Sequence, residues 1–217
     1  MVEQPKIAMI GVGNVGAALG TRFARAGLPV VFGTRSGAAP KVLEAAGPNA
    51  SVATPATAAE PADVVFLAVP AAAAVEAALA LGDLTGKIVV DCNNTLRWDA
   101  GPVWTPPAEG SIAAALQKAL PGALVVKAFN GFGAELHADP TIAGQPVTTF
   151  LAGDDPRAKE RVAAIATRAG FAPVDAGPLR NAAVLENVAM LWIHLALAGG
   201  HGRNIALQLV RRELPAP

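Results

Sequence analysis

Cysteine is nearly absent from this chain of 217 residues, in which Cys92 is the single one. One chain therefore forms no internal disulfide and no metal cage built from cysteines alone. Net charge is absent too, because 17 lysines and arginines balance 17 aspartates and glutamates. Nucleic-acid binders and proteins that bind membrane surfaces need an excess of positive charge, so we expect neither kind of partner.

The sequence also lacks a recognisable secretory signal and a long apolar run. Residues 1–6 contain an acid and a proline and lead directly into a strand-like segment, which is not the pattern of a signal peptide. The longest apolar stretch, residues 188–198, is about half the length of a membrane span and contains His194. We therefore expect a soluble, cytoplasmic protein with no membrane partner.

Short apolar runs alternate along the chain with alanine-rich segments of helical length. The runs are apolar at successive positions, which is typical of parallel strands buried on both faces. They cover residues 6–10, 28–32, 63–69, 87–91 and 124–129. Helices are predicted over residues 14–26, 71–81 and 111–120. This alternation predicts an α/β protein with a doubly wound, mostly parallel sheet.

The last third of the chain has a different pattern. It predicts a strand over 146–152, a helix over 156–169 that ends at Gly170, a strand over 172–176, and helices over 180–198 and 202–213. We expect these last two helices to form a small helical C-terminal appendage. Residues 96–109 are rich in proline and glycine, and we expect an irregular loop there.

A glycine-rich turn directly follows the first predicted strand. It has the pattern G-x-G-x-x-G and consists of Gly11, Val12, Gly13, Asn14, Val15 and Gly16. The first glycine allows a tight turn, the second lets a pyrophosphate approach the backbone, and the third lets the helix pack against the strand. The N–H groups at the start of the helix would then bind phosphate. Because the turn opens a strand–helix–strand unit, it predicts a Rossmann domain that binds a dinucleotide.

The end of the second strand indicates which dinucleotide binds. Thr34, Arg35 and Ser36 stand where an enzyme preferring NAD usually has an acid for the ribose 2′-OH, and no acid occurs from residue 4 to residue 43. Two hydroxyls and a guanidinium suit a 2′-phosphate instead. We therefore expect NADP(H). Residues 1–140 form the predicted NADP-binding domain, and residues 141–217 the predicted sheet extension and helical substrate domain.

Three other strand ends are expected to surround the nicotinamide and its ribose, because ligands of this fold bind beyond the carboxyl ends of the strands. Val69 and Pro70 end one strand, Asn93 follows another, and Ala128 lies in a third. Asn93 and its neighbour Asn94 offer amide donors and acceptors, although a pair of turn residues would look the same. Cys92 is expected to be a small buried residue beside this site and not a nucleophile.

The sequence resembles the coenzyme F-420-dependent NADP oxidoreductase family along nearly its whole length. The resemblance rests on Gly11–Gly16, Gly33–Arg35, Leu67–Pro70, Asp91–Asn94, Lys127–Asn130, Ala152–Asp155 and Val174–Leu179. It implies hydride transfer between NADP(H) and a deazaflavin, coenzyme F-420, or a flavin-type acceptor, in a homodimer. The reductase domain of six-transmembrane metalloreductases is similar too.

The resemblance also bears on the second substrate. The segment after the strand that contains Lys127 would lie near a bound deazaflavin, so Asn130 and Phe132 are expected substrate contacts, with His194 on the appendage as a third. Hydride transfer between stacked rings needs little acid–base help, and no catalytic residue is assigned. No metal is expected, since no carboxylate lies near His194 and His201 in the sequence.

Two other functions stay open from the sequence. An NADPH-dependent reductase of a small imine or carbonyl would need a proton donor, for which Lys127 and His137 are the candidates. Lys127 is otherwise expected to be a structural lysine with its charged end at the surface. A module that senses NADPH without turnover would need no such donor. The roles of His137 and His201 are unassigned.

Overall fold

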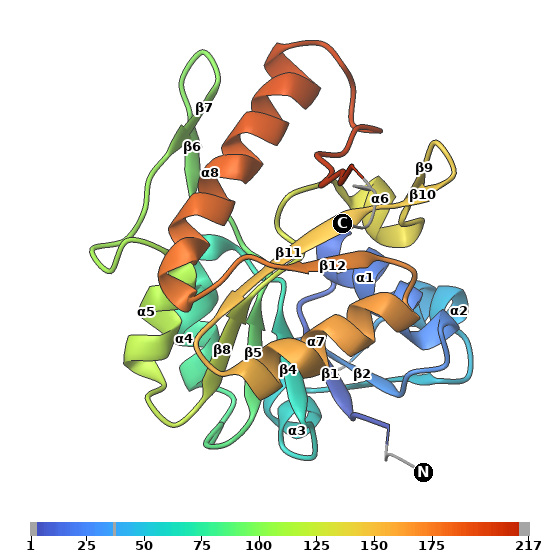
Figure 1. Ribbon diagram of the computed structural model, residues 1–217. Helices are drawn as coiled ribbons and strands as arrows, with labels where there is room; N and C mark the ends of the chain where they lie inside the picture. Colours follow the sequence, from blue (N-terminus) through green and yellow to red (C-terminus); the bar gives the residue numbers. More distant parts are fainter. Residues whose placement is uncertain (1–3, 37, 213–217) are drawn as a thin grey trace, which may run out of the picture.

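A computed structural model describes residues 4–36 and 38–212 (Figure 1). The first part of the chain alternates strands with helices, as the sequence predicts. Its elements are β1 (Ile7–Ile10), α1 (Asn14–Arg25), β2 (Val30–Gly33), α2 (Pro40–Ala46), β3 (Ala50–Ala53), α3 (Pro55–Ala59), β4 (Val64–Leu67), the 3₁₀ turn η1 (Ala71–Ala73), α4 (Ala74–Leu79) and β5 (Ile88–Asp91).

The second part contains the shortest strands together with the longest strand and the longest helix. It runs through β6 (Leu96–Trp98), β7 (Pro102–Trp104), α5 (Ile112–Ala119), β8 (Leu124–Lys127), α6 (Ala134–Ala138), β9 (Thr141–Ile142), β10 (Gln145–Pro146), β11 (Thr148–Gly153), α7 (Pro156–Arg168), β12 (Ala172–Asp175), the 3₁₀ turn η2 (Leu179–Asn181), α8 (Ala182–Ile193) and the π-helical η3 (His194–Ala198).

Eight strands form one sheet in the order β12-β11-β8-β5-β4-β1-β2-β3. Each neighbouring pair is parallel except β11 and β8, which are antiparallel. The predicted doubly wound, mostly parallel α/β fold is thus confirmed. Because β11 pairs with β8, the sheet continues from the predicted NADP-binding domain into the predicted C-terminal one, and the boundary near residue 140 stays a prediction.

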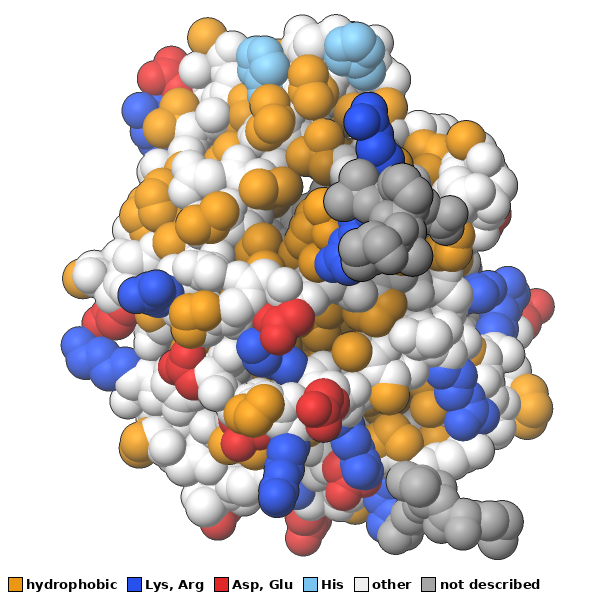
Figure 2. Space-filling view, in the orientation of Figure 1, with side chains coloured by type: hydrophobic (Ala, Val, Ile, Leu, Met, Phe, Trp, Pro, Cys, Tyr) orange, Lys and Arg blue, Asp and Glu red, His pale blue; other side chains and the backbone are white. Residues whose placement is uncertain are grey.

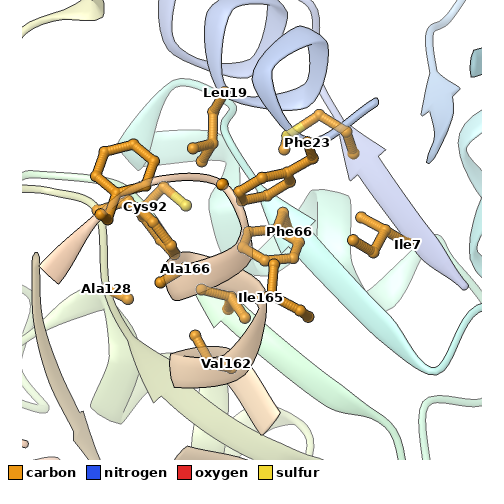
Figure 3. Close-up of a cluster of buried hydrophobic side chains, with 14 of the residues drawn as sticks. Ile7, Leu19, Phe23, Phe66, Cys92, Ala128, Val162, Ile165 and Ala166 are labelled. Carbon is orange, nitrogen blue, oxygen red and sulfur yellow. The ribbon is translucent and has the colours of Figure 1, made fainter. Parts of the chain in front are cut away.

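Helices cover both faces of the sheet and bury two apolar clusters. On one face Phe23 of α1 lies 5.0 Å from Phe66 of β4, ring centre to ring centre. Figure 3 shows these two rings with Ile165 of α7 close by. The other face packs against α3, α4 and α5. This core fixes the strand ends, which is where the predicted ligand site lies.

The predicted helix over 202–213 is wrong for residues 202–212, and residue 213 lies outside the described residues. Gly200 and Gly202 have positive φ values of 72° and 76°, which end the helix. The chain then folds back over α8 (Figure 1). Trp192 Nε1 donates a hydrogen bond to the Ile205 carbonyl at 2.7 Å, and Arg203 pairs with Glu135 at 2.6 Å. The appendage thus contains one long helix and an irregular segment.

The irregular loop predicted over 96–109 is also wrong in part, because β6 and β7 pair as an antiparallel hairpin. Ala100 and Gly101 form its turn with positive φ values. The apolar pattern of the sequence does not predict α2, β3 and α3. These elements are short, and β3 is a half-exposed strand at the edge of the sheet, so its apolar pattern is weak.

One helical stretch passes a length and composition test for a membrane span. Leu179–Ala198 has 20 residues, and an apolar stretch of 18 residues within it has a mean hydropathy of 1.4 and is 39% buried within the protein. A single helix of this kind is weak evidence for a membrane, since core helices of soluble proteins pass the same test.

Candidate functional site

The glycine-rich turn joins β1 to α1 and leaves one open position. A side chain at Gly11, where φ is +99°, would place its Cβ 2.4 Å from the Ala68 carbonyl oxygen, and one at Gly16 would lie 2.1 Å from the Gly11 oxygen. A Cβ at Gly13 would meet nothing within 4 Å. Gly11 and Gly16 therefore allow the turn to form, whereas the space beside Gly13 is left free for a ligand.

The start of α1 is suited to a phosphate. Gly13 is the N-cap, its first turn contains no acidic residue, and no side chain bonds to its free N–H groups. Such a helix start attracts anions through its N–H groups and its dipole. The residues present thus fit a pyrophosphate at this end of β1.

A cleft of about 580 Å³ begins at this turn. It continues along the carboxyl ends of β1, β2 and β4. Seven of the predicted cofactor residues line it, namely Gly11, Val12, Gly13, Thr34, Arg35, Val69 and Pro70. Ala73, Ala77 and Ala80 form an apolar wall beside them. Its lining residues thus connect the phosphate turn to the predicted adenosine end at β2 and to the predicted nicotinamide end at β4.

The other predicted cofactor residues lie outside this lining. Asn14, Val15 and Gly16 form the first turn of α1. Ser36 is exposed, Asn93 is nearly buried after β5, and Ala128 is fully buried after β8. Their contact with a cofactor stays a prediction.

The loop after β2 is ordered by its own hydroxyl groups. The buried Thr34 hydroxyl accepts a hydrogen bond from the Ala38 N–H at 3.1 Å, and the Ser36 hydroxyl donates to the Ala38 carbonyl at 3.1 Å. Arg35 is exposed, lines the cleft and forms no ion pair with the described residues. Its guanidinium is therefore available to an anionic ligand at this end of the cleft.

Lys127 is fully buried, so the prediction of a charged end at the surface is wrong. Its Nζ lies 2.8 Å from Asp91 Oδ2 and 3.4 Å from Glu186 Oε1, and it also donates to the Asn93 carbonyl. Both carboxylates are fully buried as well. Burial raises the pKa of Asp91, while the Lys127 ammonium and the Asn93 N–H act against that rise.

Glu186 has a role in this cluster that the sequence pattern does not predict. It projects from α8, and besides Lys127 it accepts hydrogen bonds from the Thr95 hydroxyl at 2.9 Å, Trp104 Nε1 at 2.8 Å and the Ile112 N–H at 3.0 Å. One carboxylate thus joins α8 to β8, the β6–β7 hairpin and the start of α5. The signal in the sequence is an acid inside an otherwise apolar helix, which is rarely buried unless it is paired.

The asparagines after β5 and β8 are held in fixed orientations. Asn93 Nδ2 donates to Asp91 Oδ1 at 2.9 Å, which leaves Asn93 Oδ1 without a partner among the described residues. Since no side-chain polar atom of the described residues is both buried and unpaired, this oxygen reaches solvent. Asn94 Nδ2 donates to the Asn130 backbone carbonyl at 2.8 Å, and Asn130 Nδ2 donates to Asn94 Oδ1 at 2.9 Å, so Asn130 Oδ1 has no partner among the described residues either. Asn93 and Asn130 are therefore the two of the three with an amide oxygen available to a ligand.

His137 lies in α6, buried between two backbone carbonyls. Its Nδ1 is 2.8 Å from the Gly133 oxygen and its Nε2 is 2.9 Å from the Phe129 oxygen. Phe129 itself has a φ of 58°, a strained value for a residue with a side chain. Burial lowers the pKa of His137, and the two carbonyls oppose this by accepting N–H bonds. The histidine thus braces the chain after β8.

The residues predicted to contact a second substrate do not all come together. Asn130 and Phe132 line one small cavity of about 10 Å³ with Leu207 of the C-terminal segment. His194 is exposed and lies near Gly101 in the β6–β7 turn. Cys92 is buried, and burial raises the pKa of its thiol, as expected for a residue that is not a nucleophile. In the part of the chain that the structure describes, no three His, Cys, Asp or Glu side chains form a metal-binding group.

The fold, the turn and the cleft define a nucleotide-binding protein of the Rossmann class. Residues 6–95 match the family model described as NADP oxidoreductase, coenzyme F420-dependent. The chain is 34% identical over 212 residues to the F420-dependent NADP reductase of Methanothermobacter thermautotrophicus, with 88% of each chain covered. The protein therefore belongs to the F420-dependent NADP oxidoreductase family and is an NADP-dependent oxidoreductase that binds NADP(H).

Two further relatives differ in how much of their length is shared. A crystal structure of a candidate F420-dependent NADP reductase from Arthrobacter sp. FB24 is 31% identical with a TM-score of 0.83, and the match covers 95% of this chain and 100% of that one. The metalloreductase STEAP3 of Rattus norvegicus is 31% identical over 194 residues. That match covers 87% of this chain but spans only 37% of the metalloreductase.

Proposed function

We propose that the protein transfers a hydride between NADP(H) and a deazaflavin, coenzyme F-420, or a flavin-type acceptor. The observation that carries this proposal is the cleft that joins the phosphate turn to Arg35 at one end and to Val69 and Pro70 at the other. Family membership supports it, because the relative from M. thermautotrophicus is named for reaction with F420.

The residues of the cleft would divide the cofactor among them. The open space beside Gly13 and the start of α1 would take the pyrophosphate, and Arg35, with Thr34 and Ser36, the 2′-phosphate. The nicotinamide would lie beyond β4 near Asn93, whose free amide oxygen can accept a hydrogen bond from the carboxamide. Bound NADPH would supply the hydride, which is one hydrogen with its pair of electrons, and the acceptor ring would take it up together with a proton from water.

The alternative function, reduction of a small imine or carbonyl, is disfavoured because neither candidate proton donor is accessible. Lys127 is buried and donates to three acceptors. Both nitrogens of His137 face backbone carbonyls, and its side chain is also buried. Neither group is free to reach a substrate in the cleft. Hydride transfer between stacked rings needs no such donor.

Stopped-flow oxidation of NADPH against a panel of acceptors tests this function. The panel contains a deazaflavin, FMN, FAD, ferric chelates and small cyclic imines. We expect rapid oxidation with the deazaflavin or a flavin and none with the imines. Oxidation of NADPH by the imines but by none of the flavin-type acceptors would contradict the proposal. Tight binding of NADPH without oxidation by any acceptor would instead indicate a sensor.

We further propose that the protein works as a cytoplasmic homodimer. Several large apolar side chains of α8 and η3 are exposed, among them Val184, Leu191 and Leu197, and Trp98 of the hairpin is 54% exposed. Figure 2 shows hydrophobic side chains gathered over the part of the surface where α8 lies, whereas charged side chains gather over the lower half. An apolar helix face of this kind suits a second copy of the chain.

A further inference from the structure

The buried cluster of Lys127, Asp91 and Glu186 has more negative than positive charge. The three N–H groups of the Lys127 ammonium have three acceptors, which are the two carboxylates and the Asn93 carbonyl. Each of these side chains is fully buried. Lys127 is therefore a satisfied cation, and its charge is shared between two acids.

The hydrogen-bond donors around the two acids favour the carboxylate form of both. The oxygens of Asp91 face the N–H and the Nδ2 group of Asn93 and the ammonium of Lys127. Those of Glu186 face its four donors described above, of which only the Thr95 hydroxyl could also accept. A protonated carboxyl would turn one oxygen into a donor facing another donor. The geometry thus fits two carboxylates.

The charges of the cluster add up to a negative sum. One ammonium and two carboxylates give −1, and the start of α5, where the Ile112 N–H meets Glu186, contributes about +0.5 from the helix dipole. Among the described residues, no second cation bonds to either acid. A negative charge of roughly one half to one therefore remains in a buried, weakly screened environment.

This charge lies at the carboxyl ends of β5 and β8, on the same side of β1 as the predicted nicotinamide end of the cleft. Arg35 at β2 marks the predicted adenosine end and Gly13 at β1 the predicted phosphates, so the rest of a dinucleotide would extend over β4 toward β5, the next strands of the sheet after β1. Neighbouring strands are about 5 Å apart. Asp91 ends β5, and Asn93 with its free oxygen stands two residues further on.

We propose that this buried charge favours the oxidised cofactor. The nicotinamide ring of NADP⁺ is positively charged and that of NADPH is neutral, so a nearby negative charge lowers the dissociation constant of NADP⁺ relative to that of NADPH. A site that stabilises NADP⁺ in this way makes bound NADPH a stronger hydride donor. The inference rests on the proposed function, because it needs the nicotinamide beside Asn93. Lys127 and Glu186 touch neither substrate and act only through the field and through Asn93.

The test compares the dissociation constants of NADP⁺ and NADPH, measured by isothermal titration calorimetry on the full chain. Glu186→Gln keeps the size of the side chain and removes one negative charge. We expect it to raise the ratio of the NADP⁺ constant to the NADPH constant about tenfold. Thr95→Val is the matched control, since it removes a hydrogen bond from the same carboxylate without changing charge. We expect its ratio to stay within about twofold of the wild-type value, because it leaves the field unchanged.

A second variant keeps the inference testable if Glu186→Gln does not fold. Asp91→Asn removes the same charge from the other side of Lys127 and should shift the ratio in the same direction. An unchanged ratio in a folded charge-removing variant, or an equal shift in Thr95→Val, would overturn the inference while leaving the proposed function intact. A wild-type protein that binds neither dinucleotide would overturn both.

Discussion

Arg35 determines the expected choice between NADP(H) and NAD(H). It is exposed in the cleft, it forms no ion pair with the described residues, and no acid stands beside it to receive a ribose 2′-OH. We expect Arg35→Ala to raise the dissociation constant for NADPH about tenfold or more and that for NADH much less, because only NADPH carries the 2′-phosphate. Fluorescence titration of the two reduced cofactors measures both constants. Equal effects on the two would remove Arg35 from the 2′-phosphate site.

His137 gives the stability of the fold a dependence on pH. Burial lowers its pKa, so below pH of about 6.5 the unfolded chain takes up a proton that the folded His137 does not. The contribution of His137 to the free energy of unfolding therefore has its full value above that pH and decreases as the pH falls. We expect urea midpoints to drop more between about pH 7.5 and 5.5 in the wild type than in His137→Gln. The same drop in both proteins would show that His137 is not responsible.

Single residues also show what a sequence can and cannot predict. The roles of Gly11, Gly13 and Gly16 follow from local spacing, and the structure places them as expected. The surroundings of Lys127 do not follow from local spacing, because its partner Glu186 lies 59 residues away in the sequence. A lysine at a strand end has the same local pattern whether its charged end reaches water or a buried carboxylate. Only the packing of α8 over β8 decides between them.

The glycine-rich turn is the element whose two functions can be separated by mutation. Gly13 has ordinary backbone angles, φ −69° and ψ −172°, and open space where a Cβ would lie. We expect Gly13→Ala to change the free energy of unfolding by less than about 1 kcal/mol. It should nevertheless weaken NADPH binding about tenfold or more, since the methyl group occupies the path of the phosphates.

Gly16→Ala is the matched control for this prediction. Its Cβ would lie 2.1 Å from the Gly11 carbonyl oxygen, so we expect it to lower the free energy of unfolding by about 2 kcal/mol or more. Urea unfolding with calorimetric NADPH titration measures both quantities. A Gly13→Ala protein that binds NADPH normally would show that the open space is not the phosphate site.

How well the sequence predicts an element depends on whether its local pattern or contacts with distant residues determine it. The buried strands β1, β4, β5 and β8 are apolar on both faces, and their pattern is strong without any tertiary information. The segment from 203 to 212 has helix-forming residues but is irregular, and Arg203 and Ile205 bond to the side chains of Glu135 and Trp192. The hairpin of β6 and β7 depends on pairing with itself and on Trp104 reaching Glu186. Contacts far apart in the sequence decide these two elements.

On the scale of the whole molecule, the exposed face of α8 is the expected dimer interface. Leu191 is 51% exposed near the middle of that face. We expect light scattering after size exclusion to give the mass of two chains for the wild type and of one chain for Leu191→Glu, since a buried charge in an apolar interface is costly. Leu79→Glu, on the distant helix α4 and 55% exposed, is the control that should stay dimeric. A monomeric wild type would contradict the proposed homodimer.

The eight-stranded sheet joins the cofactor turn at β1 to the helix α8 through the buried cluster at β5 and β8. The fold and the family show that this protein binds NADP(H). The identity of the hydride acceptor is proposed. Direct hydride transfer to that acceptor is therefore the central claim.

The most direct measurement uses NADPH that carries deuterium at the transferred position of nicotinamide C4, with an oxidised deazaflavin as acceptor in ordinary water. Mass spectrometry of the reduced deazaflavin then reports the origin of the new hydrogen, because it is bonded to carbon and does not exchange. Direct hydride transfer predicts that the reduced deazaflavin gains the deuterium. A reduced deazaflavin without deuterium, or NADPH that stays unoxidised beside the deazaflavin and the flavins alike, would contradict it.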